Sequence, residues 1–484
     1  MFNRALYGIC LPLVAALTLF GRAGASGLVG SADAARSSLD FSVLATSLVL
    51  LIPAGLTVMA VAASDEKQAA SVAAVGMVGI ALGVVICGLI GFGLQFGGLG
   101  LISDLRGLVP LVSEWSPVDR IWGPGWGTIG LDGFLLFAET LDEDLLSVFL
   151  YYGVLAGTAV CIPLLALTRR LTFLALLGFG LMFAIFVYPV YGNWAWGGGW
   201  LSQLGSTVGL GHGFIDFAGS GTIHALGGFF ALAGILVFGV RPQEVNEEAK
   251  PPPIHFPLLG VLGALLLLIG WFGLLTGKPL LMGSLPHAQL AVNVLLAACA
   301  GILMGTLYTW FVTGYPDLLM TGRSTLAALV AISASCPFVP AWAALVIGGL
   351  AGLLAPLTIY LLRVKFRLED STSAVAVHGC AGLWGLLAVG IFADGASGQG
   401  WNGVGVGAYL DVAGQGVSGL LVSSGFQPDW PQQLYAQVLG IVALLLLGLA
   451  LPWLALRGLK SLALRFAALR SQMAAMKDCT PAEE

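Results

Sequence analysis

Two stretches of the chain decide the fold: Asp216-Phe-Ala-Gly-Ser-Gly-Thr-Ile-His224-Ala-Leu-Gly-Gly228 and Asp370-Ser-Thr-Ser-Ala-Val-Ala-Val-His378-Gly-Cys-Ala-Gly382. In each, an aspartate precedes a histidine by eight residues and a glycine follows the histidine by four. Eight residues of helix span about 12 Å, so an acid at the rim of a membrane would set its histidine toward the middle. The shared pattern predicts two helices that are built alike.

Composition places the chain in a membrane. Of its 484 residues, 58% are hydrophobic and 9% are charged, and the mean hydropathy is +0.95. Soluble domains carry about 25% charged residues, so a chain this poor in charge cannot cover its surface in water. It has no basic cluster large enough to follow a phosphate backbone, which argues against nucleic acid as a partner. The seven cysteines are scattered without a CxxC pair, and we expect neither a metal site nor a cofactor.

Apolar segments long enough to cross a bilayer recur along the chain. About 20 apolar residues span a hydrocarbon core roughly 30 Å thick. We place eleven such segments near residues 39–63, 71–94, 145–167, 173–190, 213–239, 256–276, 289–313, 324–340, 341–362, 374–393 and 432–456. The expected fold is therefore an all-α polytopic membrane protein with about 11 transmembrane helices, and its membrane domain covers residues 39–456.

The N-terminus resembles a secretory signal peptide over residues 1–25. Arg4 precedes an apolar stretch, and Ala23-Gly-Ala25 forms a small-residue cleavage site. The alternative is one more membrane span. With the N-terminus of the mature chain outside, fourteen Lys and Arg residues fall on the inner side of the spans and four on the outer side. Because inner loops are enriched in Lys and Arg, we expect the C-terminus in the cytoplasm.

The two histidines predict an inverted repeat. His224 lies in the fifth predicted span and His378 in the tenth, so the two helices enter the membrane from opposite faces. Such an inverted five-plus-five helix repeat is typical of transporters whose substrate site lies at the midplane between the halves. Asp216 and Asp370 stand at the helix starts, where capping of backbone N–H groups is the ordinary role of a carboxylate. The alternative is two core histidines that each find their own hydrogen-bond partners. The matched spacing instead favours a shared role, with both side chains lining one path through the membrane.

At these residues the chain resembles the Amt/Rh family of ammonium transporters. Residues 216–224 are similar to the family's fifth-helix signature, and residues 377–382 to its tenth-helix signature. The stretch 193–201, Asn-Trp-Ala-Trp-Gly-Gly-Gly-Trp-Leu, and the Trp-Phe-Gly of 271–273 are similar to two further family motifs. All four occur in the family's order and spacing, and the likeness in layout runs from about residue 39 to 456.

The resemblance implies a homotrimer in the inner membrane of the cell, in which each protomer encloses a narrow hydrophobic pore. An intramembrane enzyme is not expected, because the sequence has no His-Glu-x-x-His, Gly-x-Ser-x-Gly or P-loop motif. The resemblance implies that His224 and His378 are the twin histidines of a central pore. It also implies that Trp196 forms an outer ammonium site, with Asp216 beside it. Ammonium or ammonia is the expected substrate, and a cytoplasmic regulator of the PII type is the conventional partner of relatives.

The chemistry can also be argued from the residue types. Ammonium carries a full charge and is costly to move through an apolar pore, whereas neutral ammonia is not. The face of Trp196 can hold the cation at the mouth with about 0.5–2 kcal/mol, before the proton is shed. The imidazoles of His224 and His378 can each donate on one nitrogen and accept on the other, and so pass on a small polar molecule or a proton.

Several residues depart from the family pattern, among them three near the expected pore. Relatives usually carry two stacked phenylalanines as pore plugs, and these positions fall on Leu155 and Leu274 here, so both plugs are expected to be aliphatic. Lys278 stands about where a small polar residue would help to bind the cation. It either faces the mouth, where its charge would oppose ammonium, or faces loop solvent, the commoner placement of a lysine.

Two longer outer segments, residues 95–144 and 394–431, carry several acids, and the second carries no lysine or arginine. Its acids are Asp394, Asp411 and Asp429. Either they form a negative mouth that draws in cations, or they belong to ordinary solvated loops.

The tail, residues 457–484, differs from the usual regulatory tail. Its apolar residues repeat at alternating spacings of three and four, an a/d seam of about two and a half heptads made by Leu459, Leu462, Phe466, Leu469, Met473 and Met476. One interpretation is a signalling helix, which makes an ammonium sensor with a separate output domain the alternative function. The other is a basic amphipathic helix that lies on the inner leaflet.

Overall fold

The computed structural model describes residues 31–102, 108, 110–122, 125–136, 143–239, 256–279 and 286–478. The signal peptide predicted for residues 1–25 lies outside these ranges. The chain divides into two compact units, residues 1–41 and 42–484. Of the first unit only the start of helix α2 (Ser31–Val49) is described, and all other described elements belong to the second unit.

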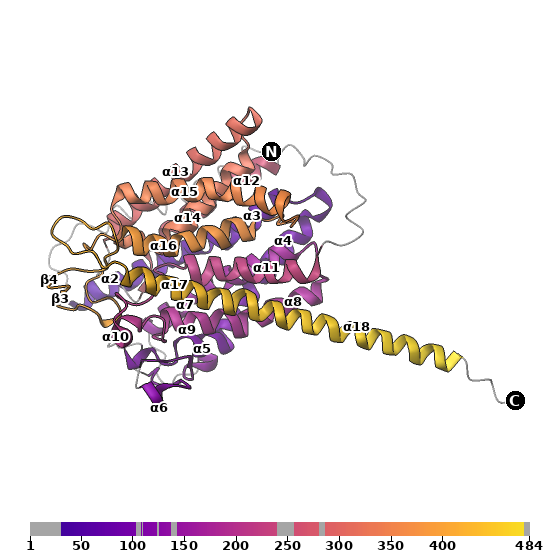
Figure 1. Cartoon of the computed structure of the whole chain (residues 1–484), viewed down its shortest axis with the longest axis horizontal. Helices are drawn as coiled ribbons and strands as arrows, with labels where there is room; N and C mark the ends of the chain where they lie inside the picture. Colours follow the sequence, from indigo (N-terminus) through magenta and orange to yellow (C-terminus); the bar gives the residue numbers. More distant parts are fainter. Residues whose placement is uncertain are drawn as a thin grey trace. The chain divides into compact units, whose positions relative to one another are not determined.

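Helices follow one another through the second unit (Figure 1). After α2 the α-helices are α3 (Leu51–Ala62), α4 (Glu66–Ile86), α5 (Phe92–Phe96), α6 (Asp119–Trp122), α7 (Glu143–Leu167), α8 (Phe173–Met182), α9 (Tyr188–Trp196), α10 (Leu204–Val208), α11 (Leu226–Phe238), α12 (Phe256–Thr276), α13 (His287–Thr313), α14 (Leu318–Ile332), α15 (Ala341–Tyr360), α16 (Ala381–Phe392), α17 (Gln432–Leu445) and α18 (Leu451–Asp478). Turns of π-helix interrupt or extend them at η1 (Cys87–Gly91), η5 (Phe183–Val187), η6 (Ser220–Ala225), η10 (Leu361–Lys365), η11 (Ala374–Cys380) and η13 (Leu446–Ala450). Short 3₁₀ turns are η2 (Leu99–Leu101), η4 (Phe134–Leu136), η9 (Cys336–Phe338) and η12 (Trp401–Gly403).

Ten helical stretches in the described part of the chain are long and apolar enough to cross a membrane. The apolar helix α14 is shorter and takes the place of the predicted span 324–340. With α14 included, each of the eleven predicted segments has its helix, and the expectation of an all-α polytopic membrane protein is confirmed. The predicted start at residue 324 is wrong, because α14 begins at Leu318. The Asp317 side chain accepts the backbone N–H of Met320 at 3.0 Å and so caps the helix earlier.

Prolines lie at two irregular points within spans, and only the first interrupts the helix. Between α2 and α3 the helix is interrupted at Leu50, because Pro53 has no N–H to donate to the carbonyl of Val49. Pro452 follows the π-helical turn η13 and joins α17 to α18 without an end to the helix. The last span therefore continues into the tail as one helical run from residue 432 to 478.

Glycines allow the spans to approach closely. Helix α13 packs against α14 and α15, and α3 packs against α12. A Cβ atom on Gly348 of α15 would lie 2.3 Å from the carbonyl oxygen of Ala297 in α13, far inside van der Waals contact. Small residues at helix crossings are expected in a membrane, where association depends on close packing because lipid is as apolar as the side chains.

Small hairpins belong to the two long connecting segments. Strand β1 (Glu114–Trp115) pairs antiparallel with β2 (Ile129–Gly130), and β3 (Ala408–Tyr409) with β4 (Val412–Ala413). Glu114 lies opposite Gly130, and Ala408 opposite Ala413. The β3–β4 hairpin stands at the end of the helices that is opposite to the free end of α18 (Figure 1). The loop 394–431 and the tail thus emerge at opposite ends of the spans, as the predicted topology requires.

The α13–α15 contact gives a test of this packing with a built-in control. Gly348→Ala should lower the stability of the folded protein by about 1–3 kcal/mol, because its methyl group meets the backbone of α13. Gly349→Ala should leave stability nearly unchanged, since the nearest atom to its Cβ, Met304 Cγ, is 3.7 Å away. The change from glycine to alanine raises the helix propensity equally at both positions, so this effect cancels in the comparison. Thermal unfolding in detergent measures the difference, and equal midpoints for the two variants would contradict the packing described.

Candidate functional site

The two histidines lie on helix starts that are built alike. His224 ends the π-helical turn η6 together with Ala225, and His378 lies in the π-helical turn η11. Each turn is preceded, five residues before the histidine, by a residue in the left-handed region: Gly219 with φ 92° and Ser373 with φ 60°. The predicted span 213–239 therefore starts later than expected, because the helix proper begins at Ser220.

The aspartates of the two motifs accept hydrogen bonds at these helix starts. Asp216 Oδ2 accepts the backbone N–H groups of Gly221 at 3.1 Å and Thr222 at 2.7 Å, and the Thr222 hydroxyl at 2.8 Å. Asp370 accepts the backbone N–H groups of residues 374, 375 and 376 at 2.8, 2.8 and 3.3 Å. Both carboxylates thereby satisfy helix N–H groups and meet the positive end of the helix dipole.

A glycine in each helix packs on the start of the other. A Cβ on Gly228 would lie 2.5 Å from the backbone nitrogen of Gly379, and a Cβ on Gly382 would lie 2.3 Å from the carbonyl oxygen of Ser220. These contacts are reciprocal, because Gly228 corresponds to Gly382 in the repeated motif. The two histidine-bearing turns are therefore held against each other by backbone contact on both sides.

This approach brings the two imidazoles together. His224 Nδ1 and His378 Nδ1 are 3.0 Å apart, and the rings meet edge to edge, with centroids 5.1 Å apart and planes 14° from parallel. Their side chains are 1% and 5% exposed. The ring of Trp271 in α12 is nearly parallel to that of His224, with centroids 5.3 Å apart, and its indole N–H donates to Ser333 Oγ at 2.8 Å.

The Nδ1–Nδ1 contact restricts the protons of the pair. Two neutral imidazoles can share a hydrogen bond at these atoms only if one Nδ1 carries the proton and the other accepts it. The ring that donates through Nδ1 then has an accepting Nε2, and its partner has a donating Nε2. One end of the pair is therefore a hydrogen-bond acceptor and the other a donor. To reverse the two ends, the shared proton must cross between the Nδ1 atoms while the accepting Nε2 gains a proton and the donating Nε2 loses one.

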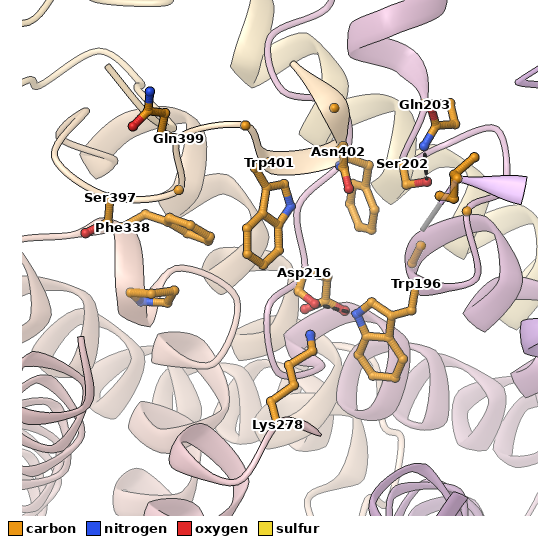
Figure 2. A pocket seen from close by; sticks show the side chains of 18 of the residues that line it. Trp196, Ser202, Gln203, Asp216, Lys278, Phe338, Ser397, Gln399, Trp401 and Asn402 are labelled. Atoms are coloured by element: carbon orange, nitrogen blue, oxygen red, sulfur yellow. Dashed lines mark hydrogen bonds between the residues drawn. The ribbon is translucent and has the colours of Figure 1, made fainter. Parts of the chain in front are cut away.

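A cavity of about 820 Å³ opens beyond this pair, and its lining combines aromatic and polar side chains (Figure 2). Trp196, Phe338 and Trp401 contribute aromatic faces, and Asp216 and Lys278 contribute charge. The indole N–H of Trp196 donates to the backbone carbonyl of Asp216 at 2.6 Å, which fixes the ring at the cavity wall. Trp401 packs edge-on against Phe338 with centroids 5.0 Å apart.

Lys278 points into this cavity. Its side chain is 5% exposed, and its Nζ donates to the carbonyl of Phe217 at 2.6 Å. Nζ also lies 4.9 Å from the ring centroid of Phe217 and 5.6 Å from that of Trp196. The expectation that this lysine faces loop solvent is wrong. Lys278 turns inward just after the end of α12, because its ammonium group finds a carbonyl and two aromatic faces there.

Burial acts on both charges of the cavity. It lowers the pKa of Lys278 to about 8, and the nearby Asp216 carboxylate opposes this shift. The same burial raises the pKa of Asp216, against the hydrogen bonds from Thr222 and Gly221 and the charge of Lys278. At neutral pH most copies of Lys278 therefore carry their proton.

The proposed plug residues lie in the protein interior. Leu155 and Leu274 are each 1% exposed, and neither lines the large cavity. The Tyr151 hydroxyl donates to the backbone carbonyl of Leu274 at 2.6 Å, which ties α7 to α12 at this level. On the far side of the histidines a cavity of about 30 Å³ is lined by residues that include His378 and Arg323.

Comparison with known proteins identifies the fold family. The model of the Ammonium Transporter Family matches residues 40–473 of the chain. The chain belongs to the ammonium transporter family. It is 33% identical over 398 residues to ammonium transporter Amt2 of Archaeoglobus fulgidus, which covers 81% of this chain and 80% of the relative. It is also 33% identical to the putative ammonium transporter sll1017 of Synechocystis, over 73% of this chain and 75% of the relative.

Solved structures have the same fold. A structure described as a sensor Amt protein superposes with a TM-score of 0.69 at 26% identity and covers 88% of this chain and 94% of its own. Candida albicans Mep2 superposes with a TM-score of 0.68 at 22% identity, over 87% of this chain and 86% of its own. The relatives of this ammonium transporter family member are transporters and not enzymes.

Some residues of the cavity in this ammonium transporter family member carry no sequence signal. Phe338 follows a turn after α14, and Trp401 lies in the loop 394–431, where no periodic pattern points to them. The acids of that loop have local partners: Asp394 accepts the N–H of Ala396 at 2.9 Å, and Asp429 accepts the Tyr409 hydroxyl at 2.9 Å. Asp394 and Asp429 are thus parts of the loop structure. None of the described acids of the segments 95–144 and 394–431 lines the cavity, and the acid in its lining is Asp216.

Removing the carboxylate at the first helix start should destabilise the protein. Asp216→Ala leaves the buried N–H groups of Gly221 and Thr222 without an acceptor, and we expect a loss of about 1–3 kcal/mol. Asp216→Asn keeps an acceptor oxygen and should retain most of the stability. Thermal unfolding in detergent measures both variants. A melting temperature of Asp216→Ala equal to that of Asp216→Asn would show that the cap does not stabilise this helix.

Proposed function

We infer that this chain conducts ammonia across the inner membrane through a hydrophobic pore between the two halves of its repeat. In this proposal ammonium sheds its proton at the outer mouth, near Trp196 and Asp216. The contact between His224 Nδ1 and His378 Nδ1, at 3.0 Å, is the observation that carries the proposal. The protein would work as a homotrimer, with its N-terminus outside and its C-terminal tail in the cytoplasm.

The apolar surroundings of the histidines support a neutral substrate. Leu155 and Leu274 would stand as the plugs between the outer cavity and the pair, and both are buried. An ion that passed them would lose its hydration shell without replacement, which is far costlier than the passage of ammonia. The histidine pair offers a hydrogen-bond acceptor and a donor to a small polar molecule in this otherwise apolar segment.

A sensor is the second candidate, because the last span runs without a break into the tail. Lys460 of α18 donates through Nζ to the carbonyl of Val237, near the end of α11, at 2.6 Å. Helix α11 continues from η6, the turn that carries His224. The likeness to a sensor Amt protein at 26% identity is in keeping with this alternative. In a sensor, occupation of the outer site would change the position of the tail and deliver a signal to a separate output domain, and a PII-type regulator would not be needed.

Uptake of methylammonium tests the pore. His224→Ala and His378→Ala should each reduce uptake to the level of cells without the protein, because each variant removes one partner of the pair. His287→Ala, at the start of α13 and outside the cavity lining, is the matched control and should retain uptake. Uptake that survives in both pair variants would refute the pore as proposed, provided that all variants reach the membrane in equal amounts.

A spin label on the tail tests the sensor. Leu464 is 64% exposed on α18, so Leu464→Cys can be labelled in a background in which Cys10, Cys299, Cys380 and Cys479 are replaced by serine. A sensor predicts that ammonium changes the mobility of this label and that Lys460→Met reduces the change. A spectrum that is insensitive to ammonium, in a protein that takes up methylammonium, would leave the transporter alone as the function.

A further inference from the structure

The outer cavity already contains a cation that belongs to the chain. The Lys278 ammonium group has one short hydrogen bond, to the carbonyl of Phe217 at 2.6 Å. Two aromatic rings lie within about 6 Å of Nζ, at 4.9 Å for Phe217 and 5.6 Å for Trp196, the range in which a ring attracts a cation. The backbone carbonyl of Asp216 fixes the Trp196 indole, so the same two neighbouring residues, Asp216 and Phe217, shape the whole position.

These contacts are the ones that a free ammonium ion needs. An ion of this kind is held by an acceptor oxygen for its N–H groups, by aromatic faces and by a negative charge nearby. The Lys278 group uses the oxygen of Phe217, the faces of Trp196 and Phe217, and the charge of Asp216. Chemically, a lysine side chain ends in an alkylated ammonium ion, so the position is filled by a close analogue of the substrate.

The charges that line the cavity are already balanced, which disfavours a second cation there. Among the described residues that line it, Asp216 is the one acid and Lys278 the one base, and Tyr152 is the remaining titratable group. One negative charge is thus matched by the lysine. A free ammonium ion beside Nζ would place two positive charges at contact distance in a partly dehydrated space, where their repulsion is weakly screened.

The position of Lys278 in the chain also favours its placement in the cavity. It follows α12 by two residues, at the helix end where the dipole favours positive charge. Figure 2 shows its side chain directed from below toward the space between Asp216 and Trp196, with Trp401 on the opposite side of the cavity.

We propose that Lys278 is a tethered competitor for the outer cation site, so that free ammonium or an alkylammonium ion binds at Trp196 only after this side chain has moved away. The proposal rests on the proposed function, because it takes the Trp196 position as the outer site. It makes Lys278 a specificity-determining residue. The charged form of the substrate is opposed at the mouth, whereas neutral ammonia meets no such repulsion.

Binding of ammonium chloride to the full-length protein in detergent tests the proposal. Isothermal titration at neutral pH would compare the wild type with Lys278→Met and Lys278→Gln, which remove the charge at similar length, and with Lys278→Arg, which keeps it. Lys365→Met, at an exposed position in η10, is the matched control for loss of a positive charge elsewhere. Two neutral variants are used so that poor folding of one does not end the experiment.

We expect both neutral variants to bind ammonium at least about tenfold more tightly than the wild type, which corresponds to about 1.4 kcal/mol. Lys278→Arg and Lys365→Met should bind like the wild type. Trp196→Ala added to Lys278→Met should abolish the gain, which locates the new binding at the outer site. Affinities of the neutral variants equal to that of Lys365→Met would overturn the proposal and leave Lys278 as a structural residue.

The outcomes separate this proposal from the proposed function. Tighter ammonium binding in Lys278→Met, together with uptake that does not depend on His224, would support the tethered competitor and refute the pore. Uptake that depends on His224, with no change of ammonium binding in Lys278→Met and Lys278→Gln, would support the pore and refute the competitor.

Discussion

The reciprocal contact between two glycines and two helix starts holds the centre of the molecule together. Because Gly228 has no side chain, the backbone of η11 can lie directly against it. The backbone of η6 lies against Gly382 in the same way. No other residue type could occupy either position without moving the helices apart, because a single Cβ atom would already overlap the opposite backbone. The separation of His224 and His378 is therefore set by main-chain contact and not by the imidazoles alone. Trp271, whose ring is nearly parallel to that of His224, further restricts the orientation of this imidazole.

The central part of the fold can be predicted because the sequence repeats its own local chemistry. The Asp-to-His and His-to-Gly spacings recur in both halves, and the structure gives both copies the same cap and the same wide turn. The start of α14 differs from its prediction for a physical reason. The charge of Arg323 favours a loop in the sequence, but its guanidinium donates to the carbonyl of Ser371 from within the helix. In the sequence, a half-buried arginine with a backbone partner cannot be distinguished from a solvated one.

The outer cavity is harder to predict, because its parts come from segments without periodicity. Trp196 stands in a recognisable motif, whereas Phe338 and Trp401 lie in turns whose position depends on tertiary contacts. The position of Lys278 is equally hard to predict. Lysines usually face solvent, and the carbonyl of Phe217, to which this one donates, is near it only in the folded chain. The result is a cavity in which aromatic surface and a balanced pair of charges meet, directly outside an apolar segment. The charges at the entrance and the apolar residues of the interior therefore come from different parts of the chain.

The π-helical turns have a consequence for how the chain tolerates change. In η6 the backbone N–H of His224 donates to the carbonyl of Gly219, five residues back, at 3.1 Å. One residue more than an α-turn is thus accommodated just where the histidine must face its counterpart. Loss of a single residue from this turn would restore ordinary helix geometry and rotate the imidazole by about 100° about the axis. The span would stay nearly as long and as hydrophobic as before. Deletion of one residue would therefore misalign the two imidazoles while the helix still inserts into the membrane.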